Sequence, residues 1–193
     1  PSGIDWLGDI PEHWDIAQLR RLVDPRRRVT YGIVQPGQID PEGRLMVRGQ
    51  DYSFGWADPS TIFRVSPEIE EPYRRARLRA GDIVMTIVGA GTGNTEVVPS
   101  FIEGANITQT TARIAPHDDH ITGEFLKHAL QSESGQRQVA IYQKGAAQPG
   151  LNLEHLVSFR VPVPPLEEQF RIAQWLDPET ARFDTLISEA EMA

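Results

Sequence analysis

The sequence predicts an α+β fold: a β-rich domain with a few short helices over residues 1–163, and a helix that begins a coiled coil over residues 164–193. Three observations predict it. Short runs rich in Val, Ile and Thr, bounded by Gly, Pro and Asp, fill residues 29–115. Apolar residues recur at helical spacing in the segment that follows. Pro164-Pro165 then separates a last short strand from a final helical pattern.

The N-terminal arm, residues 1–16, is expected to be irregular because Gly8 and Pro11 interrupt it. Its tryptophans, Trp6 and Trp14, offer large apolar surfaces that we expect to pin the arm to the domain. The next segment fits a short helix or a strand, and that choice stays open for residues 16–23. Runs rich in β-branched residues then predict strands at 29–34, 44–48, 82–88 and 110–114.

Helical patterns are weaker in the β-rich part and stronger after it. Residues 68–79 fit one helical turn or more, interrupted by Pro72. Thr122 has the hydroxyl of an N-cap and precedes apolar residues at helical spacing. The remaining predicted elements are a second helix at 134–142, a loop at 145–150, a helical turn at 151–156 and an edge strand at 159–163.

The C-terminal segment opens with Pro164-Pro165, which suits the first turn of a helix. Asp177-Pro178 is expected to break or kink this helix, with a second helix from about Glu179. Apolar residues stepping by four and three predict the start of a coiled coil. The alternative is an ordinary terminal helix folded back on its own domain. The side chains expected to face a partner are Leu166, Phe170, Leu176, Phe183 and Ile187.

Composition favours a cytoplasmic protein with a sizeable core. Hydrophobic residues make up 39% of the 193 residues, and there is no cysteine, which excludes disulfides and thiolate chemistry. No run of about 18 apolar residues is present, so no membrane span is expected. No signal peptide is recognisable at the start of the chain.

The net charge of −8 is unevenly distributed. Acidic residues dominate residues 1–19 and 154–193, whereas residues 20–153 are nearly balanced. Bases cluster in that middle segment, at residues 20–28 and 74–79, and almost all of them are arginines. The guanidinium fork pairs bidentately with phosphate and with guanine. The clusters therefore indicate a nucleic-acid surface, with a genomic bias toward arginine codons as the alternative.

No catalytic, metal or cofactor constellation stands out. The glycine-rich segment 88–94 follows a strand as a phosphate loop does, but residues 95–99 read as strand rather than helix. We therefore expect a tight hairpin there. The segment 117–120, His-Asp-Asp-His, is expected to be a solvated turn rather than a metal site. The sequence thus predicts a recognition module that is not an enzyme and needs no cofactor.

Long polar side chains in glycine-containing loops are the candidate DNA contacts. Reading a base edge requires Arg for guanine, Asn or Gln for adenine, and hydroxyl groups for either, while basic groups contact phosphate. Loops on a β scaffold are a natural place for such groups. The candidates are Tyr31, Gln35, Arg48, Gln50, Tyr52, Arg74, Arg75, Thr92, Asn94, Gln109, Lys144 and Gln148.

The junction at residues 164–177, P-P-L-E-E-Q-F-R-I-A-x-x-L-D, resembles the end of a target-recognition domain in specificity subunits of type I restriction-modification systems. The continuation at 180–187 is similar to the family's T-A-x-I-D-x-L-I, with Phe183 in place of Ile. Weaker similarities occur at 10–14 (I-P-x-x-W), at 79–89 (R-A-G-D-I followed by Gly89) and at 145–152.

This resemblance implies a division of labour. Such subunits carry two recognition domains, each reading half of a split DNA target, and two long helices that form an antiparallel coiled coil. Methyltransferase (modification) subunits and a restriction/translocase subunit carry the chemistry. The chain would be one half of such a subunit, or a half-sized subunit that forms a homodimer through its C-terminal helix. Two alternatives stay open: a recognition domain of a fused DNA methyltransferase or restriction enzyme, and a DNA-independent assembly module.

Overall fold

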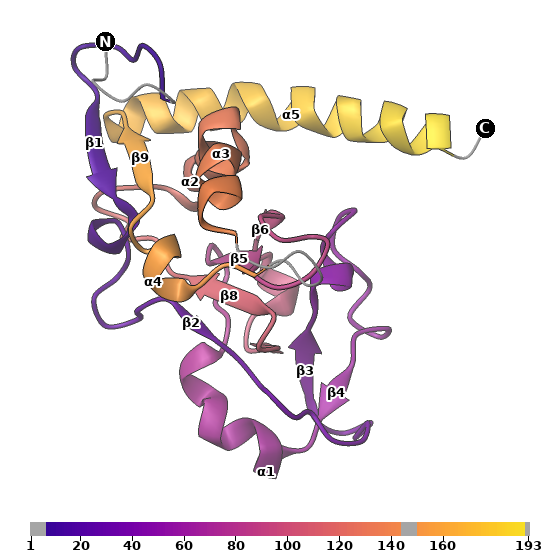
Figure 1. Cartoon of the computed structure of the whole chain (residues 1–193). Coiled ribbons are helices and arrows are strands. Elements are labelled where there is room, and N and C mark those ends of the chain that lie inside the picture. The colour runs from indigo at the N-terminus through magenta and orange to yellow at the C-terminus, as the bar shows by residue number, and fades with distance from the viewer. Residues whose placement is uncertain (1–6, 144–149, 192–193) are drawn as a thin grey trace.

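The computed structural model describes residues 7–143 and 150–191. In these ranges the strands form three small sheets around which short helices pack (Figure 1). The strands are β1 (Asp15–Gln18), β2 (Thr30–Tyr31), β3 (Arg44–Val47), β4 (Arg64–Val65), β5 (Ile83–Thr86), β6 (Thr95–Val97), β7 (Asn106–Ile107), β8 (Thr111–Ile114) and β9 (Arg160–Val163).

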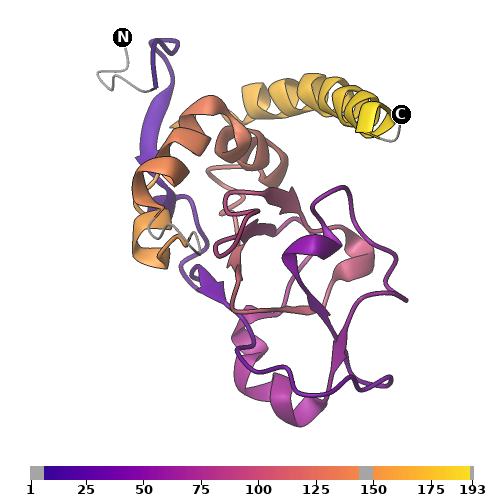
Figure 2. The same ribbon diagram turned by 45° about the vertical axis from the view of Figure 1, so that its right-hand side comes forward.

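The helices lie mainly toward the C-terminus. Figures 1 and 2 both place α5 at the end of the molecule formed by α2 and α3, with α1 at the opposite end. The α-helices are α1 (Pro67–Glu70), α2 (Gly123–Gln131), α3 (Glu133–Tyr142), α4 (Leu153–Leu156) and α5 (Leu166–Glu191). The 3₁₀ helices are η1 (Leu19–Arg21), η2 (Gly49–Asp51), η3 (Glu71–Ala76) and η4 (Ser100–Ile102). No helix of the described ranges is long and apolar enough to cross a membrane.

The central sheet has the strand order β2-β8-β5-β6, and all its pairs are antiparallel. Side chains of β5 alternate between two apolar clusters: Ile83 and Met85 pack with the helices, whereas Val84 packs on the side of β3 and β7. Both faces of this strand are buried, which explains its continuous apolar run without polar alternation. The predicted strand at 82–88 is confirmed at its centre.

A two-stranded sheet joins the two ends of the domain. β1 pairs antiparallel with β9, so that Asp15 faces Val163 and Gln18 faces Arg160. The open choice for residues 16–23 is resolved as a strand followed by the single 3₁₀ turn η1. The predicted edge strand before the prolines is confirmed, and Pro162 is tolerated there because an edge strand has an unpaired side.

The local signals for the short helices are also confirmed. The Thr122 hydroxyl accepts a hydrogen bond from the Phe125 amide, as an N-cap does. Pro72 lies where α1 gives way to η3, so the α-helix ends within one turn as its missing amide requires.

The expected break at Asp177-Pro178 is wrong, because α5 continues from Leu166 to Glu191 through Pro178. Pro178 cannot donate to the carbonyl of Gln174, but both residues are exposed, so water can satisfy that oxygen. Two residues later the Thr180 hydroxyl donates to the carbonyls of Leu176 (3.0 Å) and Asp177 (3.1 Å). Proline on the solvent side therefore costs the helix one backbone bond without ending it.

Candidate nucleic-acid interface

Loops at one end of the central sheet are hydrogen-bonded to one another and form a continuous surface, which we call the loop face (residues 31–35, 48–54, 87–94 and 107–110). The Ile33 amide donates to the Ile107 carbonyl at 2.7 Å, and the Gln109 amide donates back to Ile33 at 2.9 Å. Gly32 permits this approach, since a Cβ there would lie only 1.8 Å from the Ile107 oxygen. The Ile87 amide donates to the carbonyl of Thr110 at 2.8 Å, which joins a third loop.

The fourth loop, 48–54, is fastened to the same surface by side chains. The Asn94 amide nitrogen donates to the Ser53 hydroxyl at 3.1 Å, and the Ser53 hydroxyl donates to the Gly49 carbonyl at 2.6 Å. The Tyr52 hydroxyl lies 2.7 Å from the Thr86 hydroxyl. Loops that are distant in sequence are therefore held in one fixed arrangement.

The glycine-rich segment forms the hairpin expected from the sequence, but the connection is longer than a tight turn, since residues 87–94 separate the two strands. It joins the antiparallel strands β5 and β6, and Gly89 and Gly93 have φ values of +105° and +98°, which favour glycine. The Thr92 hydroxyl donates to the Gly89 carbonyl at 2.6 Å across the turn. A strand follows, so no helix N-terminus is available for a phosphate.

Most of the candidate DNA contacts gather on the loop face. Tyr31, Gln35, Gln50 and Gln109 are exposed there, and Thr92 and Asn94 are half-buried. Tyr52 is corrected: only 1% of it is exposed, and its ring packs in the core against Trp56. Burial raises the pKa of Tyr52 and keeps its hydroxyl a neutral hydrogen-bonding group. Lys144 and Gln148 lie outside the described residues.

Arg48 is held in a defined position by its own loop. Its Nη2 lies 3.2 Å from Asp51 Oδ1, and its backbone amide donates to Asp51 Oδ2 at 2.8 Å. The guanidinium also stacks over the Phe63 ring, 5.7 Å from its centroid. Asp51 accepts from only some of the N–H groups of the Arg48 guanidinium. About a third of the Arg48 side chain is exposed, so its other N–H groups are available to a ligand.

Phe54 is an exposed residue of the loop face that sequence reasoning missed. It is 96% exposed, although its neighbours are fixed: Ser53 by hydrogen bonds, and Trp56 by donation from its ring nitrogen to the Val97 carbonyl at 2.8 Å. The sequence signal that could have identified Phe54 is an aromatic residue beside a glycine in a polar loop. In the structure that glycine, Gly55, has φ +88°. A phenyl ring that projects from a loop fixed on both sides can contact the apolar edges of bases.

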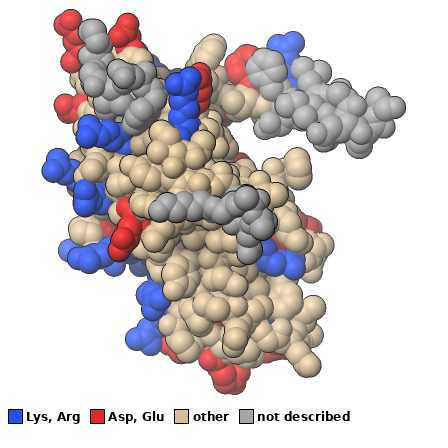
Figure 3. All heavy atoms as spheres, in the orientation of Figure 1, with Lys and Arg blue, Asp and Glu red and all other residues tan. Residues whose placement is uncertain are grey.

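The arginine clusters meet in a separate open groove of about 720 Å³, lined by residues of the segments 25–30, 74–79, 103–104 and by Arg113, which we call the arginine groove. In the face seen in Figure 3, Lys and Arg side chains gather along the edge that holds β1 and β2, and the centre is largely uncharged. Two candidate DNA contacts lie here rather than on the loop face. Arg74 forms an ion pair with Glu71 (2.9 Å), and Arg75 Nε donates to the Thr30 hydroxyl (3.4 Å).

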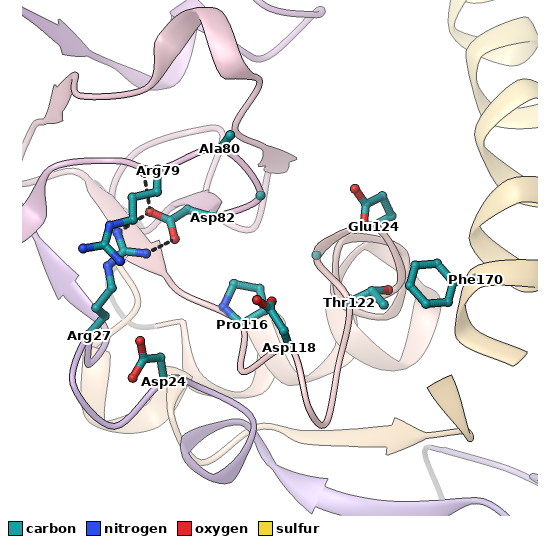
Figure 4. A pocket seen from close by; sticks show the side chains of 12 residues that line it. Asp24, Arg27, Arg79, Ala80, Asp82, Pro116, Asp118, Thr122, Glu124 and Phe170 are labelled. Atoms are coloured by element: carbon teal, nitrogen blue, oxygen red, sulfur yellow. Dashed lines mark hydrogen bonds and ion pairs between the residues drawn. The ribbon is translucent and has the colours of Figure 1, made fainter. Parts of the chain in front are cut away.

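Several of the arginines are structural. Arg27 makes a bidentate pair with the buried Asp82, with both N–O distances 2.6 Å. Figure 4 shows this carboxylate beside Arg27 and Arg79, across a hollow of about 410 Å³ from Phe170. Arg77 pairs with the buried Glu70 at 2.6 Å. Burial opposes ionisation of Glu70, but the hydrogen bonds from Arg77 and Asn106 outweigh it and lower its pKa.

The junction motif has a structural role that its sequence did not reveal. Gln169 is fully buried: its side-chain oxygen accepts from the Thr122 amide, and its nitrogen donates to the carbonyls of His120 and Pro164, all at 2.9 Å. Beside it, Glu168 accepts from the indole of Trp14 at 2.9 Å, as the expected anchoring of the N-terminal arm requires. Trp6 lies outside the described residues.

The residues expected to face a partner differ in exposure, because the first turns of α5 pack against the domain. Phe170 is 60% exposed, whereas Leu166 and Leu176 are half-buried, and the side chains of Phe183 and Ile187 lie outside the described part. Trp175, which was not among the candidates, is 67% exposed. On the opposite face, Ala173 packs into the domain and Asp177 lies 2.7 Å from His128 of α2. The first turns of α5 thus fold back on their own domain and still present aromatic surface.

The loop face lies on a mixed-sheet domain that continues into a long C-terminal helix, and a family comparison identifies this class of protein as a DNA-recognition module. Residues 56–190 match the model of the type I restriction modification DNA specificity domain, and the chain belongs to this family. It is 33% identical over 184 residues to the type I restriction enzyme EcoBI specificity subunit of Escherichia coli. It is 24% identical to the MjaVIII specificity subunit of Methanocaldococcus jannaschii. The expectation of a recognition module rather than an enzyme agrees with this family.

The chain covers only part of these relatives. The two alignments include 95% and 88% of this chain but 38% and 40% of the relatives. Solved structures show the same fold: the HsdS subunit from Thermoanaerobacter tengcongensis superimposes with a TM-score of 0.66 at 20% identity, over 92% of this chain and 44% of that one. A chain from a type I R-M system, solved in a study of complex assembly and conformational transition, superimposes with a TM-score of 0.67 at 22% identity. The predicted α+β fold with a C-terminal helix is confirmed.

Proposed function

We propose that this chain reads double-stranded DNA as a specificity module of a type I restriction-modification complex, through base contacts made by the loop face. The observation that carries the proposal is the hydrogen-bonded convergence of four polar loops, in a chain of the DNA specificity family. The exposed amides of Gln35 and Gln50 offer both a donor and an acceptor, the pattern that adenine requires, whereas the Gln109 amide nitrogen donates to the carbonyls of Ile33 and Val34 and leaves its oxygen as an acceptor. Arg48 and Phe54 add a guanine-type donor and an apolar contact.

The proposal assigns residues 1–163 to DNA reading and residues 164–193 to assembly. Methyltransferase subunits and a restriction/translocase subunit would supply the chemistry, and the module would direct them to one half of a split target. Exposed Phe170 and Trp175 on α5 support an assembly role, including pairing with a second copy of the chain. Action on DNA in the cytoplasm is part of the same proposal. The relatives described above are named as specificity subunits, so a fused methyltransferase is the less favoured alternative.

The test is selection from a pool of randomised duplexes by the full chain, repeated at several salt concentrations because phosphate contacts weaken with salt. We expect enrichment of a short motif of a few base pairs, and a chain that enriches no motif at any salt concentration does not have the proposed function. A second comparison separates reading from assembly. Replacing the exposed Phe170 and Trp175 with alanine should weaken partner binding without removing the domain contacts of α5, and DNA binding absent from both the unmodified and the variant chain would favour the DNA-independent assembly module.

A further inference from the structure

The arginine groove is positively charged although the chain as a whole is acidic. Eight arginines line it, and Glu103 is the one acidic side chain among the lining residues of the described structure. Three further carboxylates that do not line the groove pair with these arginines: the buried Glu70 and Asp82 and the exposed Glu71. Counted against these four carboxylates, the eight arginines leave an excess of four positive charges in the groove.

The unbalanced charges lie at the surface. Arg26, Arg28, Arg75 and Arg79 are exposed, and within residues 7–143 and 150–191 none of them has a carboxylate within ion-pair distance. They belong to two segments far apart in the chain. Guanidinium groups with free donors, distributed along an open groove, suit a ligand with repeated negative charges.

Arg113 forms the buried base of this groove and ties its segments together. Only 2% of the residue is exposed, and its guanidinium donates to the carbonyls of Arg27 (3.0 Å), Arg28 (3.0 Å) and Arg75 (3.1 Å). Its Nε is buried without a hydrogen-bond partner. Burial, followed by the neighbouring charge of Arg27, lowers the pKa of Arg113 to about 10. The groove therefore contains a buried cation repelled by Arg27 and Arg79, which Asp82 and Asp24 offset only in part, and a bound anion would relieve the remaining repulsion.

We propose that the arginine groove binds the phosphodiester backbone of DNA, with Arg26, Arg28, Arg75 and Arg79 contacting phosphates. This inference rests on the proposed function, which assigns base contacts to the loop face and leaves the backbone without a site. The groove and the loop face lie on either side of β2, the edge strand of the central sheet: Thr30 lines the groove, and the next residue, Tyr31, is exposed on the loop face. One duplex can then place phosphates in the groove and base edges against the loops.

The experiment measures the salt dependence of binding to the duplex selected by the unmodified chain. Two double variants, Arg26→Gln/Arg28→Gln and Arg75→Gln/Arg79→Gln, each remove two proposed phosphate contacts. Each lost contact should lower the slope of log K against log salt by about 0.9. Between 50 and 200 mM KCl, each double variant should therefore lose about 12-fold less affinity than the unmodified chain. The selected motif should stay the same, since phosphate contacts carry no sequence information directly.

A matched control removes two charges elsewhere. Arg137→Gln/Arg171→Gln changes two exposed arginines on α3 and α5 and should leave the slope unchanged. Circular dichroism confirms that each variant is folded. Two results would show that the groove is not the phosphate site, in a chain that does select a motif: the groove variants keep the salt slope of the unmodified chain, or the control variant lowers the slope by the same amount. In both cases the proposed function still stands. If the unmodified chain selects no motif, the proposed function itself fails.

Discussion

The buried side chain of Gln169 should be the main fastening between α5 and the recognition domain. Replacing it with methionine, Gln169→Met, keeps the volume but removes three hydrogen bonds of 2.9 Å. It also leaves the amide of Thr122 and the carbonyls of His120 and Pro164 without their partner. Since each group left without its partner costs about 1 kcal/mol or more, the free energy of unfolding should fall by at least about 3 kcal/mol. For a domain of this length that corresponds to a Tm lowered by about 6–12 °C.

The assay is urea and thermal unfolding followed by far-ultraviolet circular dichroism, which reports the helices. Gln174→Met is the matched control: it makes the same chemical change on the same helix, at an exposed position, and should alter stability by no more than about 0.5 kcal/mol. If Gln169→Met and Gln174→Met unfold at the same urea concentration, the three hydrogen bonds do not fasten the helix. A loss of DNA binding without a loss of stability would point instead to a direct contact.

Four further outcomes follow from the same structure. Gly32→Ala should reduce soluble folded protein and lower the Tm, because its Cβ would meet the Ile107 carbonyl at 1.8 Å; an unchanged Tm would contradict that close approach. Phe54→Ala should weaken binding to the selected duplex by about 10-fold, roughly one favourable apolar contact, while Phe101→Ala, also at an exposed phenylalanine, should not; equal affinities would exclude Phe54 from the interface. Hydrogen bonds from Trp14 and His13 lower the pKa of Glu168 in the folded chain. The ionised Glu168 carboxylate therefore stabilises the folded chain fully above its unfolded pKa of about 4.3, and this contribution is lost as the pH falls through the lower folded pKa. The Tm difference between the unmodified chain and Glu168→Gln should therefore shrink below pH 4, and a constant difference would refute this. Trp175→Ala should leave the Tm unchanged and weaken binding to modification subunits in calorimetric titration; full affinity would place the assembly surface elsewhere.

Local patterns in the sequence were sufficient to predict the elements that depend on residues close together in the chain. The Thr122 cap, the glycine hairpin and the prolines at 164 and 165 depend on neighbouring residues alone, and each is present as expected. The strand predicted at 29–34 is shorter, since only Thr30–Tyr31 pairs in the ladder and Ile33 makes a single bridge to Thr108. Pro178 shows the limit of a local rule, because its effect on the helix depends on which side of α5 faces water.

The candidate site was only partly predictable for a related reason. Polar residues in loops were recognised by type, yet type does not reveal burial. Tyr52 resembles the other candidates in sequence, but packing against Trp56 and Thr86 makes it a core residue. Arg113 lies in an ordinary β-rich run and gave no signal, although it organises the arginine groove through carbonyls of residues 27, 28 and 75.

The sequence by itself determined the α+β class, the change from strand to helix at Pro164-Pro165, the clustering of arginines and the resemblance to specificity subunits. Only the tertiary structure decided which arginines are internal partners of Asp82 and Glu70, which remain exposed in the groove, and which loops share a face. Turns, caps and periodicity arise from interactions between residues close in the chain. Whether a polar side chain is buried and paired or exposed and free to bind depends on the charges and hydrogen-bonding groups around it. Here those groups come from segments up to 86 residues away in the chain.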